Sequence, residues 1–458
     1  MLGISAALLT ALLLLGLQTP ETLPTEGQRM AAIFAVVLIL WVTEALPVAV
    51  TSLLAIVLLP IFGVADLGTA FTTFISPVFF FVLAMFIIAQ AFISSGLDRR
   101  FALWLLARAG TDSRRVLIVF MLGTCLVSTI MSDVPATAIF MALALGLFEK
   151  MQIRRGESAF AKAVMIGIPF AALIGGVATP AGSSINILGI FFIQEYGNVT
   201  VRFLDWMIIG IPLVLAMMPL AIWALLWWYP PEMDQVTAVS DVQAERDRLG
   251  PISAREWRVL MILTTMIVLW ILSTWIQSLN VVLVSLSGAI AMFLPGMRLF
   301  TWKEAERGIG WEALMMVGGV TALGAASVET GLAQWLVDGS FSGLEEWSAM
   351  GIVGMVSAFT VVIHLALTIG PVINSVLIPP LALLAISTGQ NPALYALPVA
   401  FTASCAFLVP LDAVPLLTYG KGYYRMLDMV APGTILSICW VVLITLLAVG
   451  LGPVVGLL

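Results

Sequence analysis

The sequence RVLIVFMLGTCLVSTIMSDVPATAIFMALALGLF, residues 115–148, is an apolar stretch that Pro135 interrupts near its middle. A second stretch, GIVGMVSAFTVVIHLALTIGPVINSVLIPPLALLAIST at 351–388, is interrupted in the same way by Pro371. Proline breaks a helix because it lacks an amide hydrogen and clashes with the preceding turn. Each stretch therefore predicts two half-length helices joined by a turn, and we expect both to form re-entrant helical hairpins.

The composition of the 458-residue chain is that of a membrane protein. Hydrophobic residues make up 61% of the chain and charged residues 10%, with a mean hydropathy of +1.11. Soluble domains carry about 25% charged residues. The net charge of -6, without a basic face, disfavours nucleic-acid binding. No cofactor motif or metal-ligand cluster occurs in the sequence, so we expect no cofactor beyond a coupling ion.

Eleven apolar segments predict membrane-spanning helices, each needing about 20 mostly apolar residues. They lie at 2–17, 29–46, 48–64, 77–95, 159–178, 204–229, 257–276, 280–296, 311–328, 393–410 and 430–452. The first reads as a retained helix rather than a cleaved signal peptide, because it lacks a basic start and a clear cleavage site. The segments at 159–178 and 393–410 run into Gly- or Pro-rich breaks. Within a bilayer, such breaks are tolerated only where protein or a wet cavity surrounds them.

The placement of Lys and Arg predicts the orientation. Alternating the eleven spans puts 18 of the 20 basic residues on one side and leaves Arg29 and Arg202 on the other. Basic loops face the cytoplasm. We therefore expect a multi-pass protein of the plasma or inner membrane, with a cytoplasmic N-terminus and an external C-terminus.

The two halves of the chain predict an inverted repeat. Helices ending in AFISSGL (91–97) and ASVETGL (326–332) are each followed by a short amphipathic segment. The first segment is surrounded by Arg99, Arg100 and Arg108, the second by Asp338, Glu345 and Glu346, which places the two on opposite membrane faces. Inverted repeats with paired broken helices are typical of secondary transporters. The expected divisions are a first helix at 1–28, a first repeat at 29–229, a cytoplasmic linker at 230–256 and a second repeat at 257–458.

Three motifs resemble those of a known family. LWVTEALPVAVTSLLAIVLLP (40–60), GGVATPAGSSIN (175–186) and ASCAFLVPLDAVPLLTYGKGY (403–423) are similar to signatures of the divalent anion:sodium symporters, the sodium–dicarboxylate and sodium–sulfate cotransporters. The resemblance covers nearly the whole chain. It implies a homodimer with a scaffold domain, and an elevator-type transport domain made of both hairpins and both broken helices.

The resemblance also assigns site residues. The family has Ser-Asn-Thr at each hairpin tip, where this chain has Ser132-Asp133-Val134 and Thr368-Ile369-Gly370. The implied substrate contacts are Asp133, Ser183, Asn186, Thr368, Asn374 and Pro415. Few of the family's substrate-binding hydroxyls remain, so the resemblance does not fix which anion is carried.

A first cation site is predicted at the first tip. Ser128 and Ser132 are four residues apart and share a helix face. The resemblance implies that they bind sodium together with Asp133 and a carbonyl near Gly182. A carboxylate is a better ligand for a hard cation than the family's amide. The alternative is that Asp133 only caps the helix that follows it.

A second site is expected from the resemblance at His364 and Asp412. The two side chains there form an ion pair in place of a sodium ion, or carry a proton. The alternative is a packed histidine that bonds a backbone carbonyl. If the second tip is shifted in the alignment, the site lies instead at Thr368, Asn374 and Ser375.

Together these features predict an all-α secondary active transporter for a small divalent anion, a dicarboxylate or sulfate, coupled to sodium. A proton-coupled or exchange-type carrier is the alternative for the coupling. An ion channel is a more distant alternative, and so is a membrane-embedded aspartyl hydrolase that uses two aspartates.

Overall fold

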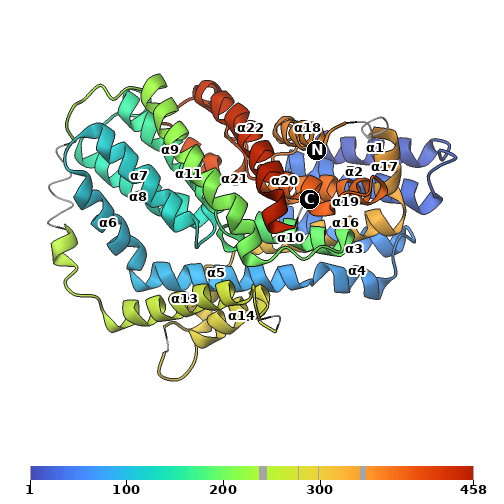
Figure 1. The fold of residues 1–458 in the computed structure, drawn as a ribbon, viewed down its shortest axis with the longest axis horizontal. Helices are drawn as coiled ribbons and strands as arrows, with labels where there is room; N and C mark the ends of the chain where they lie inside the picture. Colours follow the sequence, from blue (N-terminus) through green and yellow to red (C-terminus); the bar gives the residue numbers. More distant parts are fainter. Residues whose placement is uncertain (1, 237–244, 277, 298, 341–346, 457–458) are drawn as a thin grey trace.

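The computed structural model describes residues 2–236, 245–276, 278–297, 299–340 and 347–456 (Figure 1). Within these ranges the chain is helical, and the only β-type pairing is an isolated bridge between Asp112 and Gln235. The prediction of an all-α fold is confirmed.

The first repeat follows the single helix α1 (Leu2–Gly16). Its elements are α2 (Thr25–Thr43), α3 (Val48–Ile61), α4 (Leu67–Phe74), α5 (Pro77–Ser95), α6 (Leu97–Ala109), α7 (Ser113–Ser128), α8 (Asp133–Lys150), α9 (Ala159–Gly176), η1 (Pro180–Gly182), α10 (Ser184–Gly197) and α11 (Phe203–Trp228).

The second half of the chain shows the same succession of α-helices, but its 3-10 helix follows the short helix α21, whereas η1 precedes α10. Its elements are α13 (Ala254–Leu272), α14 (Val281–Ala291), α15 (Trp302–Glu306), α16 (Trp311–Glu329), α17 (Leu332–Ser340), α18 (Ala349–Ile363), α19 (Gly370–Ser387), α20 (Pro392–Thr402), α21 (Ala413–Tyr419), η3 (Met426–Asp428) and α22 (Val430–Val455).

Both stretches form two helices joined by a turn, α7–α8 and α18–α19. Helices α7 and α8 pack on each other as the arms of a hairpin, whereas α18 packs mainly on α20 and α22 rather than on α19. The turns precede the prolines that suggested them. Pro135 and Pro371 lie in the first turns of α8 and α19, where a missing amide hydrogen breaks no helical hydrogen bond.

Each of the eleven predicted spans contains a helix, but not all are long enough to cross a bilayer alone. Among the described residues, seven helical segments have the required length and apolar character. One of these is α19, which the sequence predicted as a hairpin arm, and another is α4 and α5 taken together. Helices α1, α3, α14, α18 and α20 are apolar but shorter.

The helices α5 and α16 end in the same way in the two repeats. Gly96 and Gly331 have φ of +85° and +75°, and their amides donate to the carbonyls of Ile93 and Val328 at 3.0 Å. Glycine adopts this left-handed conformation without steric cost. The Gly-Leu motif at 96–97 and 331–332 therefore stops one helix and lets α6 or α17 leave in a new direction.

Packing between the repeats is reciprocal. Helix α3 packs on α16 and α14 packs on α5; likewise α10 packs on α19 and α21 packs on α8. Figure 1 shows α6 at the left end of the long axis and α17 at the right end. This exchange of partners supports an inverted repeat. Of the acids expected around α17, Glu345 and Glu346 lie outside the described residues, as does the side chain of Asp338.

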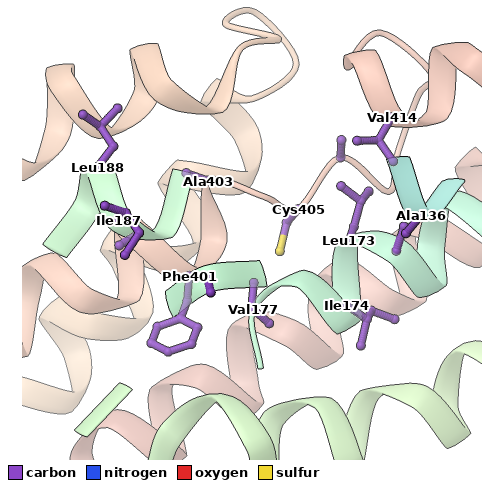
Figure 2. Packing of buried hydrophobic residues seen from close by; sticks show 14 of the residues in the cluster. Ala136, Leu173, Ile174, Val177, Ile187, Leu188, Phe401, Ala403, Cys405 and Val414 are labelled. Atoms are coloured by element: carbon purple, nitrogen blue, oxygen red, sulfur yellow. The ribbon is translucent and has the colours of Figure 1, made fainter. Parts of the chain in front are cut away.

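The broken helices α9 and α20 lie at the centre of the fold. Every residue of α20 and nearly every residue of α9 is buried. Figure 2 shows Leu173 and Ile174 of α9 beside Val177, Ala403 and Cys405 of the two breaks. Both breaks are thus surrounded by protein, as the bilayer requires of irregular backbone.

The end of the linker is held against α6 by one arginine. Arg100 donates from Nε to Glu256 Oε1 at 2.6 Å and from Nη1 to the carbonyl of Gly250 at 2.8 Å. Glu256 also accepts from the amide of Ser253 in the capping box of α13. Burial by itself raises the pKa of Glu256, but the hydrogen bonds from Arg100 and Ser253 outweigh it and lower the pKa below its usual value of 4.5.

Candidate functional site

The first break brings two backbone segments into close contact. Helix α9 ends at Gly176, and Gly182 closes the short η1 helix before α10 begins. A Cβ on Gly182 would lie 2.3 Å from the carbonyl oxygen of Gly176 and 2.9 Å from that of Ser128. Only glycine fits at this position without a backbone shift, because Cβ atoms essentially never approach other atoms more closely than 3.0 Å. The absence of a side chain at Gly182 therefore lets the carbonyl oxygens of Gly176 and Ser128 lie close to the backbone of Gly182.

Four oxygen-bearing residues predicted to hold a cation meet at this break. Three oxygen atoms border the space that a side chain on Gly176 would fill. A Cβ placed on Gly176 would lie 3.3 Å from Ser128 Oγ, 3.3 Å from the carbonyl oxygen of Gly182 and 3.8 Å from Asp133 Oδ2. Ser132 Oγ donates to Asp133 Oδ1 at 3.0 Å. A set of hydroxyl, carbonyl and carboxylate oxygens suits a hard cation.

Asp133 is buried without a basic partner. Its side chain is 4% exposed, and no ion pair joins it to any residue in the described part of the chain. The N-cap of α8 is Ser132, and Asp133 is the first residue of the helix itself. A buried, unpaired carboxylate is costly and requires a cation or a proton to neutralise it.

Ser183 and Asn186 stabilise the first break. Asn186 is fully buried, and its Nδ2 donates to the carbonyls of Gly176 at 2.8 Å and Thr179 at 2.9 Å. Ser183 is the N-cap of α10, accepting from the amide of Ile185. The neighbouring Ser184, rather than Ser183, lines a cavity. Both predicted substrate contacts are thus engaged with backbone in this structure.

His364 and Asp412 lie near each other but do not bond. Both line a cavity of about 10 Å³ at the second break. The Nε2–H of His364 donates to the carbonyl of Ala403 at 3.1 Å, while Asp412 caps α21 by accepting from the amide of Val414 at 2.9 Å. The structure therefore matches the alternative of a packed histidine bonded to a backbone carbonyl.

The helix that Asp412 caps packs against the first tip. Helix α21 packs against α8 and α9, and Figure 2 shows Val414 of α21 beside Ala136 of α8. Asp412 and Asp133 therefore stand at the N-termini of two helices that pack together, and like charges there repel each other.

The second tip joins the two repeats. A Cβ on Gly370 would lie 2.6 Å from Ile185 Cδ1 and 2.7 Å from the carbonyl oxygen of Ala403. Asn374 is fully buried, and its Nδ2 donates to the carbonyl of Ile185 at 2.9 Å. Its partner in the alternative second site, Ser375, donates to its own helix at the carbonyl of Val372.

Pro415 and Thr368 are the other two predicted substrate contacts in the second half of the chain. Pro415 is buried, and its carbonyl accepts from the Tyr424 hydroxyl at 3.0 Å. Thr368 is half-buried in the turn before α19. Among the described residues, no hydrogen bond joins Thr368, Asn374 and Pro415 to one another.

Two tryptophans that the sequence did not indicate support the breaks. Trp206 Nε1 donates to the carbonyl of Val177 at 2.8 Å, and its ring stacks on Phe401 with centroids 4.0 Å apart. Trp440 Nε1 donates to Thr402 Oγ1 at 3.3 Å. For Trp440 the available signal was an indole in the interior of an apolar span, whereas Trp206 lies in the first turn of α11, where the sequence offers no such signal.

Comparison with known proteins identifies relatives over nearly the full length. A membrane protein of Cupriavidus necator is 29% identical, with 90% of this chain and 84% of that protein covered. The sodium-dependent dicarboxylate transporter SdcS of Staphylococcus saprophyticus is 27% identical, with 99% and 91% covered. The YdaH transporter of Alcanivorax borkumensis has a similar fold, with a TM-score of 0.50 at 16% identity, covering 83% of this chain and 85% of that one.

A family model provides the final comparison. The model described as the sodium:sulfate symporter transmembrane region matches residues 1–458, which is the whole chain. This confirms the resemblance drawn from the three sequence motifs. The chain belongs to the sodium:sulfate symporter family and is a transporter rather than an enzyme.

Proposed function

We propose that this protein is a secondary active transporter that moves a small divalent anion, a dicarboxylate or sulfate, together with sodium. The observation that carries the proposal is the oxygen cluster at the first break, where the buried carboxylate of Asp133 has no basic partner among the described residues. A bound sodium ion neutralises that carboxylate and completes a site for an anion.

Coupling follows from the charges at the site. Asp133 and Asp412 stand on helices that pack together, α8 and α21, and neither forms an ion pair with a basic side chain in the described part of the chain. An anion is repelled from the empty site and accepted once a cation is bound. The N-termini of α8 and α10 then offer amide hydrogens to it.

The proposed movement is of the elevator type. Both hairpins and both broken helices form the moving body, and the helices that exchange partners between the repeats, such as α3 with α16 and α5 with α14, form the scaffold. We further propose a homodimer in the plasma or inner membrane, with the linker and α6 on the cytoplasmic side.

Proton coupling is the second candidate, because a proton neutralises Asp133 as well as sodium does. The experiment that separates the two is uptake into proteoliposomes. Succinate and sulfate are each offered with a sodium gradient, with a pH gradient, or with neither. Sodium-driven accumulation of either anion supports the proposal. Accumulation driven only by the pH gradient establishes the alternative, and uptake that never exceeds equilibrium contradicts coupled transport.

A further inference from the structure

A cavity of about 480 Å³ lies between α6 and α8. Figure 1 shows α6 beside the ends of α7 and α8, and α6 packs on both helices. The described residues that line the cavity include none from the first tip or the first break. Its volume lies within the range of small-molecule sites, about 300–1,000 Å³. The cavity is therefore large enough for a ligand, and it is separate from the cation cluster.

Much of the cavity is apolar. Aliphatic side chains line it from both helices: Leu103, Leu106, Ile139, Leu143 and Leu147. The three from α8 recur every fourth residue and so share one face of that helix. Ala142 lines the cavity on the same side of α8 and is exposed. The cavity is therefore open at the surface of the helical bundle.

Charged residues of both signs line the same cavity. They are Asp98 and Arg99 at the start of α6, Lys150 at the end of α8 and Glu245 of the linker. Glu245 pairs with Arg99, and its second oxygen lies 4.0 Å from Lys150 Nζ. Asp98 forms no ion pair in the described part of the chain. Desolvation by partial burial raises the pKa of Asp98 above its usual value in spite of the neighbouring Arg99, so a cationic group beside this carboxylate would stabilise it.

Trp104 indicates that α6 lies at the level of the lipid headgroups. Its side chain is 42% exposed, and the guanidinium carbon of Arg108 lies 3.5 Å from the centre of its ring. Phe101 stacks on the same ring. Aromatic and basic side chains gather on helices that lie along a membrane surface. A cavity that opens there, apolar in one part and charged in another, has the character of a phospholipid site.

We propose that the cavity between α6 and α8 binds phosphatidylethanolamine, with the headgroup ammonium at Asp98, the phosphate at Arg99 and Lys150, and an acyl chain along the aliphatic side chains. The ammonium has three N–H donors for a carboxylate, and the phosphate accepts from Arg and Lys. The site is independent of which anion and which coupling ion are transported.

Other common headgroups fit these charges less well. Phosphatidylcholine carries the same two charges, but its quaternary ammonium has no N–H to donate to Asp98. Phosphatidylglycerol has the phosphate and no cation, so it would leave Asp98 unpaired beside a negative headgroup. A hydrogen bond to a charged group changes binding at least about tenfold. We therefore expect phosphatidylethanolamine to bind about tenfold more tightly than either.

The test is a titration of the purified full-length protein in detergent with each of three lipids that have the same dioleoyl chains. These are phosphatidylethanolamine, phosphatidylcholine and phosphatidylglycerol. Native mass spectrometry reports the bound lipid and its Kd, and thermal unfolding with the same lipids reports the stabilisation that binding produces. Because the acyl chains are identical, differences in Kd belong to the headgroup.

Asp98→Asn keeps the shape of the side chain and removes its charge. It should weaken phosphatidylethanolamine about tenfold and leave phosphatidylcholine unchanged. Glu149→Gln is the matched control, because Glu149 is an exposed acid next to Lys150 that does not line the cavity; it should leave all three Kd values unchanged. Ala142→Phe, on the exposed side, should fill the cavity and weaken all three lipids, and it keeps the test decisive if Asp98→Asn does not fold.

Four outcomes overturn the proposal. Phosphatidylethanolamine that binds no more tightly than phosphatidylcholine refutes the role of Asp98, and so does an equal loss in Asp98→Asn and Glu149→Gln. Tightest binding of phosphatidylglycerol would identify a site for anionic lipid instead. Lipid binding that Ala142→Phe leaves intact would place the lipid outside this cavity. None of these results bears on sodium-coupled uptake.

Discussion

Replacing Gly182 with alanine should disrupt the first break and the cation site together. The added Cβ would lie 2.3 Å from the carbonyl oxygen of Gly176, where ordinary contact begins at 3.4 Å. Backbone must therefore move by about 1 Å. The two atoms that the Cβ would meet are the backbone carbonyl oxygens of Gly176 and Ser128, so no flexible side chain can move to relieve the clash. Overpacking of this kind typically costs 1–3 kcal/mol, so we expect a loss of about 2 kcal/mol in stability.

The backbone that would be displaced, at Ser128 and at Gly182 itself, also carries proposed cation ligands. Because the carbonyl of Gly182 and the hydroxyl of Ser128 border the same space, a 1 Å shift should raise the sodium concentration for half-maximal uptake about tenfold, which corresponds to about 1.4 kcal/mol. The assay is sodium-dependent uptake of labelled succinate or sulfate by proteoliposomes, together with thermal unfolding in detergent with and without sodium.

Gly146→Ala is the matched control. Gly146 lies within α8, and a Cβ there meets no atom within 4 Å. This variant should be as stable as the unmodified protein or more stable by about 0.5–1 kcal/mol, because glycine is costly inside a helix. The account of the break is refuted if Gly182→Ala unfolds and responds to sodium as Gly146→Ala does.

Three further predictions concern other parts of the fold. Glu256→Gln should lower the thermal stability at pH 7, and this loss should disappear as the pH falls below about 4.5, because a carboxyl with a lowered pKa stabilises the fold only while it is ionised. Melting curves of both proteins from pH 7 to pH 4 test this, and a difference in Tm between them that grows at low pH contradicts it. The effects of His364→Ala and Asp412→Ala on stability should add to within about 0.5 kcal/mol, because the two side chains do not bond; a double-mutant cycle that shows stronger coupling indicates an ion pair. A cysteine that replaces Arg154, in the exposed loop between α8 and α9, should react with an impermeant reagent only from the cytoplasm. A cysteine that replaces Gln390, in the equivalent loop between α19 and α20, should react only from outside. Labelling of both positions from the same side excludes an inverted repeat.

The breaks in the two apolar stretches and the meeting of oxygen-bearing residues at the first break were predictable because their signals are local. A proline in the middle of an apolar stretch, or a Gly-Leu pair at a helix end, acts through the backbone of its own segment. Ser128 and Asp133 lie directly on either side of the turn that brings them together. The glycines of the first break were visible as a motif, and the structure explains the need for them by the contact between Gly176 and Gly182.

Contacts between distant segments were not predictable in the same way. The partner of His364 depends on the turn at 364–369, which is longer than the turn at 129–132 and brings the ring to Ala403. Asn374 bonds a carbonyl of the opposite repeat. The helices predicted at 280–296 and 393–410 form as the shorter α14 and α20, and the helices that cover them are not apparent from their own sequence.

The Asp133 carboxylate is the central element of the proposed coupling. Asn at this position keeps the shape and one oxygen ligand but removes the charge. Since contacts to charged groups are worth about 1.5–3 kcal/mol, sodium binding should weaken at least about tenfold while transport persists at high sodium.

The most direct measurement is therefore the sodium activation curve of anion uptake by Asp133→Asn, recorded in proteoliposomes at several pH values beside the unmodified protein. The account predicts a curve shifted to higher sodium with an unchanged pH profile. A flattened pH profile with the sodium curve in place would make Asp133 a proton carrier. Curves that coincide in both sodium and pH would contradict any role for Asp133 in coupling.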